Sequence, residues 1–145
     1  ARENPRALTQ RANPVPIMYG DASWLETAGR LLIVSFFVVA GLYNLTGERI
    51  RDHIERLAGF GFPFPTAAFW AGITLQFSGC ALLLTDWHAE IGAWCLIVFT
   101  VAANAMFHRY WIVQDPARRN FIRLLLLNGI AILGGLLLVL ESVRG

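Results

Sequence analysis

Four long stretches of this chain contain no acidic residue, Arg or Lys, and they constrain its fold more than any other feature. They are residues 31–47, 57–85, 91–107 and 124–140. Each has at least 17 residues, and roughly 17–25 apolar residues are needed for a helix to cross a bilayer core. A helix of a soluble protein needs a polar face. Four such runs therefore predict membrane-spanning helices.

The runs predict an all-α, integral membrane four-helix bundle, because a helix satisfies its own backbone hydrogen bonds in lipid. We expect membrane helices at about residues 24–45, 66–85, 90–111 and 116–143. Between the first two, Ile50, Ile54 and Leu57 recur at helical spacing among charged residues. This pattern predicts a short interfacial amphipathic helix at about residues 48–58.

Local signals refine these bounds. Ser23 and Glu26 form a capping-box pattern ahead of the first membrane helix. Thr66 is expected to cap the second helix, and Pro116, after Asp115, to begin the fourth. Arg30 lies near the start of the first helix, where we expect it to snorkel to the headgroups. Residues 1–23 contain three prolines and are predicted to form an extended N-terminal arm.

Composition excludes several functional classes. Hydrophobic residues make up 56% of the chain and charged residues only 15%. The net charge is +2 and the basic residues, all Arg, are scattered, so no nucleic-acid surface is predicted. No catalytic Ser/His/Asp set, phosphate-binding loop or dinucleotide fingerprint is present. His53 and His108 fall on one side of the membrane, but without further ligands at metal-binding spacing we predict no metal site.

The distribution of Arg predicts an orientation. Seven of the 12 lie in or beside the first and third connections, and the other five on the opposite side. The positive-inside rule therefore places these two connections in the cytoplasm and both termini outside.

The densest group of polar and aromatic residues lies at the end of the third run. Asn104 and His108 are four residues apart and so share one helix face. Arg109, Tyr110 and Trp111 follow, and these residue types anchor helix ends at the membrane–water interface.

Polar residues within the runs suggest one candidate pocket. Gln76 and Asn104 lie at depths that would allow a hydrogen bond between the second and third helices. Such structural pairing is one interpretation. The alternative is a polar wall for a quinone-like ring or a bound lipid, formed by Tyr43, Gln76, Asn104 and His108. No cofactor is otherwise predicted.

The two cysteines provide a second candidate. Cys80 and Cys95 lie at nearly equal distances from the second connection, on adjacent antiparallel helices. They are either a redox pair or two small apolar residues in the core.

Several motifs resemble the DoxX-like family of membrane proteins. They are RLLI at residues 30–33 with Phe36, GLYNL at 41–45, GFPFP at 61–65 with Gln76 and Gly79, NFIR at 120–123 and LGGL at 133–136. The resemblance covers about residues 28–141. It implies a four-helix protein of a bacterial inner membrane, linked to redox systems such as a quinone-reducing thiosulfate oxidoreductase and thiol-associated complexes.

The chain departs from the family pattern at two positions. Asn44 stands where the family often has Lys, and Gln76 where it often has Glu. We therefore expect a non-catalytic accessory or scaffolding subunit of a larger membrane electron-transfer complex, with the lipid bilayer and other membrane subunits as partners. The alternative is a small quinone- or thiol-linked membrane oxidoreductase.

Overall fold

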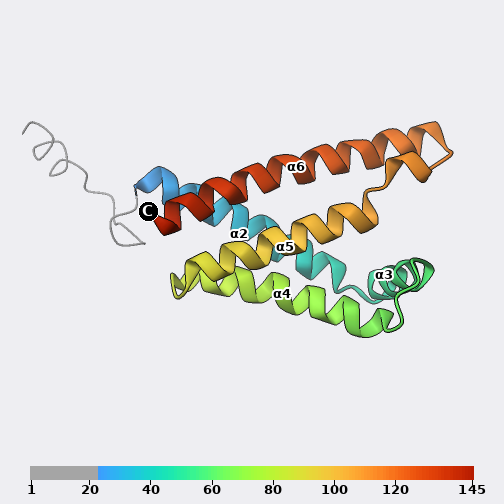
Figure 1. Ribbon diagram of the computed structural model, residues 1–145, viewed down its shortest axis with the longest axis horizontal. Coiled ribbons are helices and arrows are strands. Elements are labelled where there is room, and N and C mark those ends of the chain that lie inside the picture. The colour runs from blue at the N-terminus through green and yellow to red at the C-terminus, as the bar shows by residue number, and fades with distance from the viewer. Residues whose placement is uncertain (1–22) are drawn as a thin grey trace, which may run out of the picture.

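The computed structural model describes residues 23–145, which form five α-helices and one 3₁₀ turn with no strand. The elements are α2 (Trp24–Asn44), α3 (Gly47–Gly59), α4 (Pro65–Thr85), α5 (Ala89–Phe107), η1 (Tyr110–Ile112) and α6 (Pro116–Arg144) (Figure 1). The predicted all-α fold is confirmed. The predicted arm lies outside the described residues, apart from Ser23.

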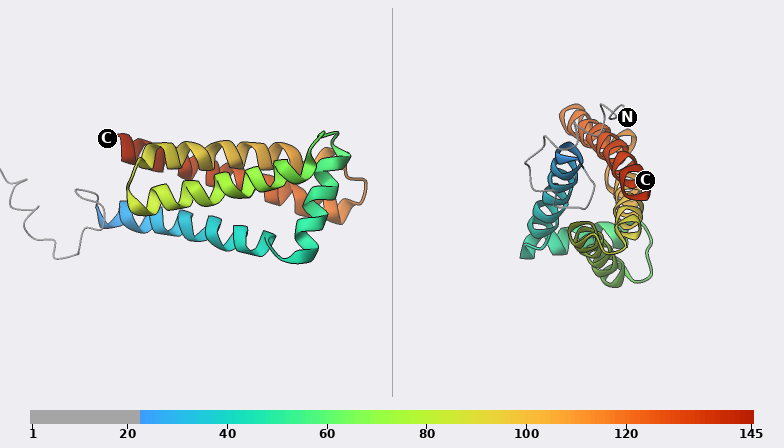
Figure 2. Two further views of the ribbon diagram at one scale, coloured as in Figure 1. Left: turned by 90° about the horizontal axis from the view of Figure 1, so that it is seen from below. Right: turned by 90° about the vertical axis from the view of Figure 1, so that its left-hand side faces the viewer.

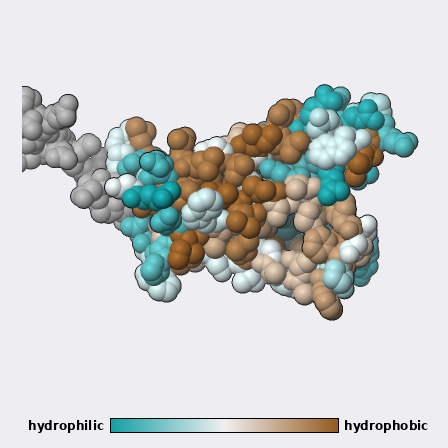
Figure 3. Space-filling view, viewed as in Figure 1, coloured by the Kyte–Doolittle hydropathy of each residue, from teal (hydrophilic) through white to brown (hydrophobic). Residues whose placement is uncertain are grey.

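Four of the helices are long and apolar enough to cross a membrane. They are α2, α4, α6 and the segment Ala89–Ile112, which comprises α5 and η1. On the face shown in Figure 3, hydrophobic residues form a band between hydrophilic ends, as expected of a surface that faces lipid. The protein is therefore a multi-pass integral membrane protein in contact with the bilayer.

The four long helices form a ring in which each packs against two others. The order around the ring is α2, α4, α5, α6 and back to α2 (Figure 2). The main core lies inside this ring, toward the end at which α2 begins. Its largest fully buried apolar side chains are Leu83, Leu96 and Leu136.

Two glycines allow α4 and α5 to approach closely. A Cβ atom on Gly92 would lie 2.9 Å from the carbonyl oxygen of Gly79, and one on Gly79 would lie 2.9 Å from Cγ of Leu96. Gly72, elsewhere on α4, allows no such approach, because a Cβ there would only touch Phe99. Close contact between these helices therefore depends on Gly79 and Gly92.

Helix α3 lies across one end of the bundle (Figure 2). Its residue Leu57 is buried with Phe69 and Ile73 of α4 in a second, smaller core. The predicted amphipathic helix is thus present, and its apolar face covers the bundle end.

Helix caps agree with the sequence at two ends and differ at two others. Ser23 and Glu26 form the predicted capping box, and the Asp115 side chain accepts a hydrogen bond at the start of α6. The prediction for Thr66 was wrong, because α4 begins at Pro65, whose fixed φ and missing N–H suit a first helical position. The third membrane span, predicted to reach residue 111, extends to Ile112, but its α-helix α5 ends at Phe107, since His108 leaves the helical conformation.

The expectation that Arg30 snorkels to the headgroups was wrong. Its side chain is buried, and its Nη1 lies 2.7 Å from Oδ1 of Asp86 in the turn between α4 and α5. An acidic partner inside the protein replaces the headgroup, so the guanidinium points into the bundle.

Candidate ligand cavity

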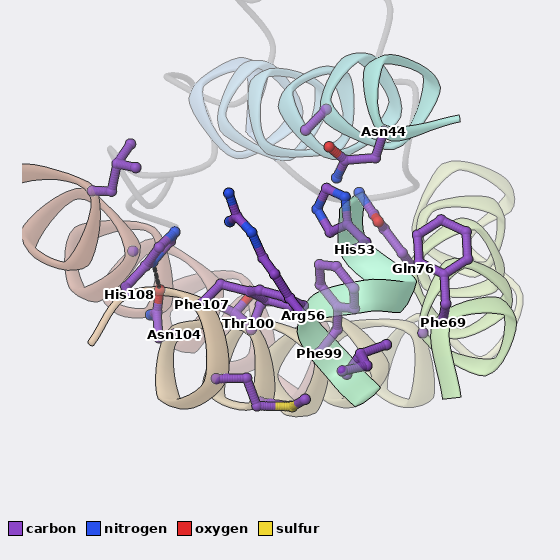
Figure 4. Close-up of a pocket in the computed structure, with 18 of the residues that line it drawn as sticks. Asn44, His53, Arg56, Phe69, Gln76, Phe99, Thr100, Asn104, Phe107 and His108 are labelled. Carbon is purple, nitrogen blue, oxygen red and sulfur yellow. Dashed lines mark hydrogen bonds between the residues drawn. The ribbon is translucent and has the colours of Figure 1, made fainter. Parts of the chain in front are cut away.

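A cavity of about 760 Å³ opens at the α3 end of the bundle, between the four long helices and α3 (Figure 4). Its volume is within the range of roughly 300–1,000 Å³ that is usual for small-molecule sites. Aromatic side chains supply much of the wall. They are Phe36, Phe37, Phe62, Phe69, Phe99, Phe107 and Phe121.

Polar side chains from every surrounding helix also line the cavity. They are Asn44, Arg49, Asp52, His53, Arg56, Gln76, Thr100, Asn104, His108, Arg118 and Asn128. Apolar walls with a limited set of polar groups are typical of sites that hold a small organic molecule in one orientation.

Gln76 is the most deeply buried polar residue of this set, with 1% of its surface exposed. Its Nε2 donates a hydrogen bond to the backbone oxygen of Phe37 on α2, at 2.7 Å. Gly41 makes room for this contact, because a Cβ there would lie 3.2 Å from Nε2. The predicted bond between Gln76 and Asn104 is therefore not formed: Gln76 binds α2 instead of α5. Its Oε1 has no hydrogen-bond partner among the described residues.

Asn104 and His108 form a pair at the end of α5, as their spacing suggested. Nδ1 of His108 lies 2.7 Å from Oδ1 of Asn104. The Asn104 side chain packs directly on the backbone of Gly129 in α6, where a Cβ would overlap it. Because Gly129 has no side chain, Asn104 can occupy this space. From there Asn104 contacts the His108 ring.

His53 is a cavity residue that the sequence suggested only as a partner for a metal. Its Nδ1 lies 2.7 Å from the backbone oxygen of Arg49. Its ring contacts Phe69 and Phe107, with centroids 5.8 and 5.3 Å away. The sequence contains a pattern that indicates this position. His53 is four residues before Leu57 and so lies on the apolar face of the amphipathic helix, which faces the bundle.

Tyr43 does not join the other three residues of the predicted pocket. It is 57% exposed and does not line the cavity. Its hydroxyl accepts a 2.6 Å hydrogen bond from Nη2 of Arg49, whose guanidinium lies 3.8 Å above its ring. Gln76, Asn104 and His108 therefore line one cavity, with Gln76 across from the other two (Figure 4), and Tyr43 is not part of it.

The two cysteines lie away from the cavity. Cys80 is buried in the main core, whereas Cys95 is only partly buried, and both are free thiols. Neither lines the cavity. Within residues 23–145, no three His, Cys, Asp or Glu side chains form a group that could hold a metal ion.

The predicted interface anchors surround the break after α5. Nε of Arg109 donates to the backbone oxygen of Ala105 at 2.7 Å, and its guanidinium lies 4.9 Å from the Phe60 ring. Tyr110 and Trp111 form an edge-to-face pair in η1, and Trp111 is exposed. These residues lie outside the cavity lining.

The comparisons with known proteins identify one family. The DoxX family model matches residues 25–109, which run from the start of α2 to just beyond the end of α5. No curated protein and no solved structure matches the chain. The matched region covers more than half of the sequence and includes His53, Gln76, Asn104 and His108. The chain therefore belongs to the DoxX family and is one of its multi-pass membrane proteins.

Proposed function

We propose that this protein binds a lipid-soluble quinone in the cavity, as the quinone-holding subunit of a bacterial membrane electron-transfer complex. The observation that carries the proposal is the cavity itself, which combines aromatic walls with the buried amide of Gln76 and the partly buried imidazoles of His53 and His108. A quinone has the matching chemistry: a flat apolar ring, two polar oxygens and a hydrocarbon tail.

The lining also provides a route for the tail. Phe36 of α2 and Phe121 of α6 both line the cavity and are both exposed, so the cavity wall is open at these two helices. Because the outer surface of the bundle faces lipid, a tail leaving the cavity between α2 and α6 would enter the hydrocarbon layer without crossing water. The ring would remain near the polar residues of α3, α4 and α5.

The accessory role remains part of this proposal. In it the protein binds and orients the quinone, and a partner subunit exchanges electrons with the bound ring. The excess of Arg near the α3 end supports a cytoplasmic position for the mouth of the cavity. The partner would then approach from that side of the membrane.

The test is a binding titration with the purified protein in lipid nanodiscs. A benzoquinone carrying a decyl tail is the probe, and quenching of tryptophan fluorescence is the readout. Trp70 is a suitable reporter, because its ring contacts the cavity residue Phe69, with centroids 5.4 Å apart. We expect saturable quenching by the decyl quinone and none by an alkane of the same length.

Two alanines on α5 provide matched variants. Ala103 lines the cavity, whereas Ala105 is exposed and does not. Ala103→Phe should fill part of the cavity and abolish saturable quenching, and Ala105→Phe should leave it unchanged. Non-saturable quenching in the wild-type protein, or equal affinity in both variants, would contradict the proposal.

A further inference from the structure

The hydrogen position on His53 follows from its partner. A backbone carbonyl oxygen only accepts hydrogen bonds, so the 2.7 Å contact between Nδ1 and the Arg49 oxygen requires a hydrogen on Nδ1. In a neutral imidazole the other nitrogen, Nε2, then holds a lone pair. Helix α3 itself therefore determines the tautomer of this histidine.

The Nε2 lone pair has no hydrogen-bond partner among the described residues, although His53 lines the cavity. The two contacting rings, Phe69 and Phe107, restrict the orientation of the imidazole. Figure 4 shows His53 in the middle of the group, with Arg56 extending between it and His108. The cavity thus contains an oriented acceptor that makes no hydrogen bond within residues 23–145.

Gln76, another lining residue, has a second unpartnered acceptor, which is buried in the cavity wall. Its Nε2 is engaged with the Phe37 oxygen, which assigns the unpartnered atom as the carbonyl oxygen Oε1. Donors are present as well, since the guanidinium groups of Arg56 and Arg118 also line the cavity. A ligand that satisfies both kinds of group must be able to donate as well as accept hydrogen bonds.

We infer that the cavity binds the reduced hydroquinone in preference to the oxidised quinone, and that Nε2 of His53 accepts a hydrogen bond from one of its hydroxyl groups. This inference rests on the quinone-binding function proposed above. Quinone oxygens can only accept hydrogen bonds, so an oxidised ring would place an oxygen lone pair against that of Nε2. A hydroxyl group donates to His53 and still accepts from an arginine.

The experiment compares the affinity of the protein for the decyl quinone and for its hydroquinone, both measured without oxygen in the same nanodiscs. An unsatisfied buried acceptor costs enough to weaken binding by roughly 5- to 100-fold. We therefore expect wild-type protein to bind the hydroquinone tighter by a factor in that range. His53→Phe keeps a ring between Phe69 and Phe107, and it should remove the preference by weakening hydroquinone binding.

Two further variants separate hydrogen bonding from structure. His53→Gln retains an acceptor and should restore part of the preference. His88→Phe changes a histidine in the turn before α5, outside the cavity lining, and should leave both affinities unchanged.

The outcomes distinguish the inference from the proposed function. If wild-type protein bound neither form, the proposed quinone binding itself would fail. Equal binding of both forms would overturn only the preference for the hydroquinone. If His53→Phe weakened both forms by the same factor, His53 would have a purely structural role and the inference would be wrong.

Discussion

Arg30 and Asp86 form an ion pair between the first turns of α2 and the turn that joins α4 to α5. Nη1 lies 2.7 Å from Oδ1, and the Arg30 side chain is 5% exposed against 49% for Asp86. Asp86 also has a positive φ of 55°. Asp86 therefore closes the tight turn between α4 and α5 and also pairs with the buried charge of Arg30, which lies far away in the sequence.

Removing the charge of Asp86 should destabilise the bundle. Asp86→Asn keeps a side chain that tolerates positive φ but leaves Arg30 without this carboxylate. Because Asp86 is half exposed, we expect a loss of about 1–3 kcal/mol, as for hydrogen bonds to charged groups. The measurement is thermal or SDS-induced unfolding in detergent micelles. The exposed pair between Arg144 and Glu90 is the control, and Glu90→Gln should change stability by less than about 1 kcal/mol.

Gly92 should tolerate no side chain. Its Cβ would lie 2.9 Å from the Gly79 carbonyl oxygen and 3.1 Å from the Leu83 nitrogen. Because these are backbone atoms, Gly92→Ala must separate α4 from α5, and we expect a loss of about 1–3 kcal/mol in the same unfolding assay. Gly134→Ala, where a Cβ meets nothing within 4 Å, should be neutral or slightly stabilising. Similar stabilities of the two variants would show that the helices are not in close contact.

The position of Asn104 should depend on Gly129. Gly129→Ala forces the Asn104 side chain to move and thereby releases His108 from its hydrogen bond. We expect severalfold weaker binding of the decyl quinone, with the affinity of Gly134→Ala unchanged. If Gly129→Ala kept normal helicity and an unaltered affinity, Asn104 and His108 would not take part in quinone binding.

Replacing Gln76 by Leu should affect binding more than stability. The variant loses the hydrogen bond to the Phe37 oxygen, and interhelical hydrogen bonds in membrane proteins contribute on the order of 0.6 kcal/mol. It also removes an unpartnered buried oxygen, which partly offsets that loss. The free energy of unfolding should therefore change by less than about 1 kcal/mol, while the affinity for the hydroquinone falls. A large destabilisation with intact binding would assign Gln76 a structural role.

The tautomer of His53 can be measured without any ligand. Nitrogen NMR shifts of 15N-histidine-labelled protein should show the hydrogen on Nδ1 of His53, because that atom bonds the Arg49 oxygen. His88 is exposed and serves as the internal reference, and His53→Phe assigns the signal. A hydrogen on Nε2 of His53 would contradict both the bond and the inference built on it.

Much of the fold could be predicted from local sequence patterns. Runs without charges specify spanning helices because lipid penalises every unpaired polar group. The capping box at Ser23 and the amphipathic pattern around Ile54 are equally local, and both were correct. The end of α5 was missed because the interface residues Arg109 and Trp111 suit a helix end without indicating where the helix stops.

The candidate site was only partly predictable. Sequence spacing placed Asn104 beside His108, since both belong to one turn of one helix. It could not assign the partner of Gln76, because that depends on how α2 and α4 are rotated about their axes and on the space left by Gly41.

The sequence by itself determined four membrane helices, the amphipathic helix between the first two, and the pairing of Asn104 with His108 on one turn. Only the tertiary structure decided that Arg30 points inward to Asp86, that Tyr43 faces outward, and that His53 enters the cavity. The physical reason is the range of the interactions. Hydrophobicity and capping act within a few turns of one helix, whereas these side-chain positions depend on contacts between helices distant in the chain.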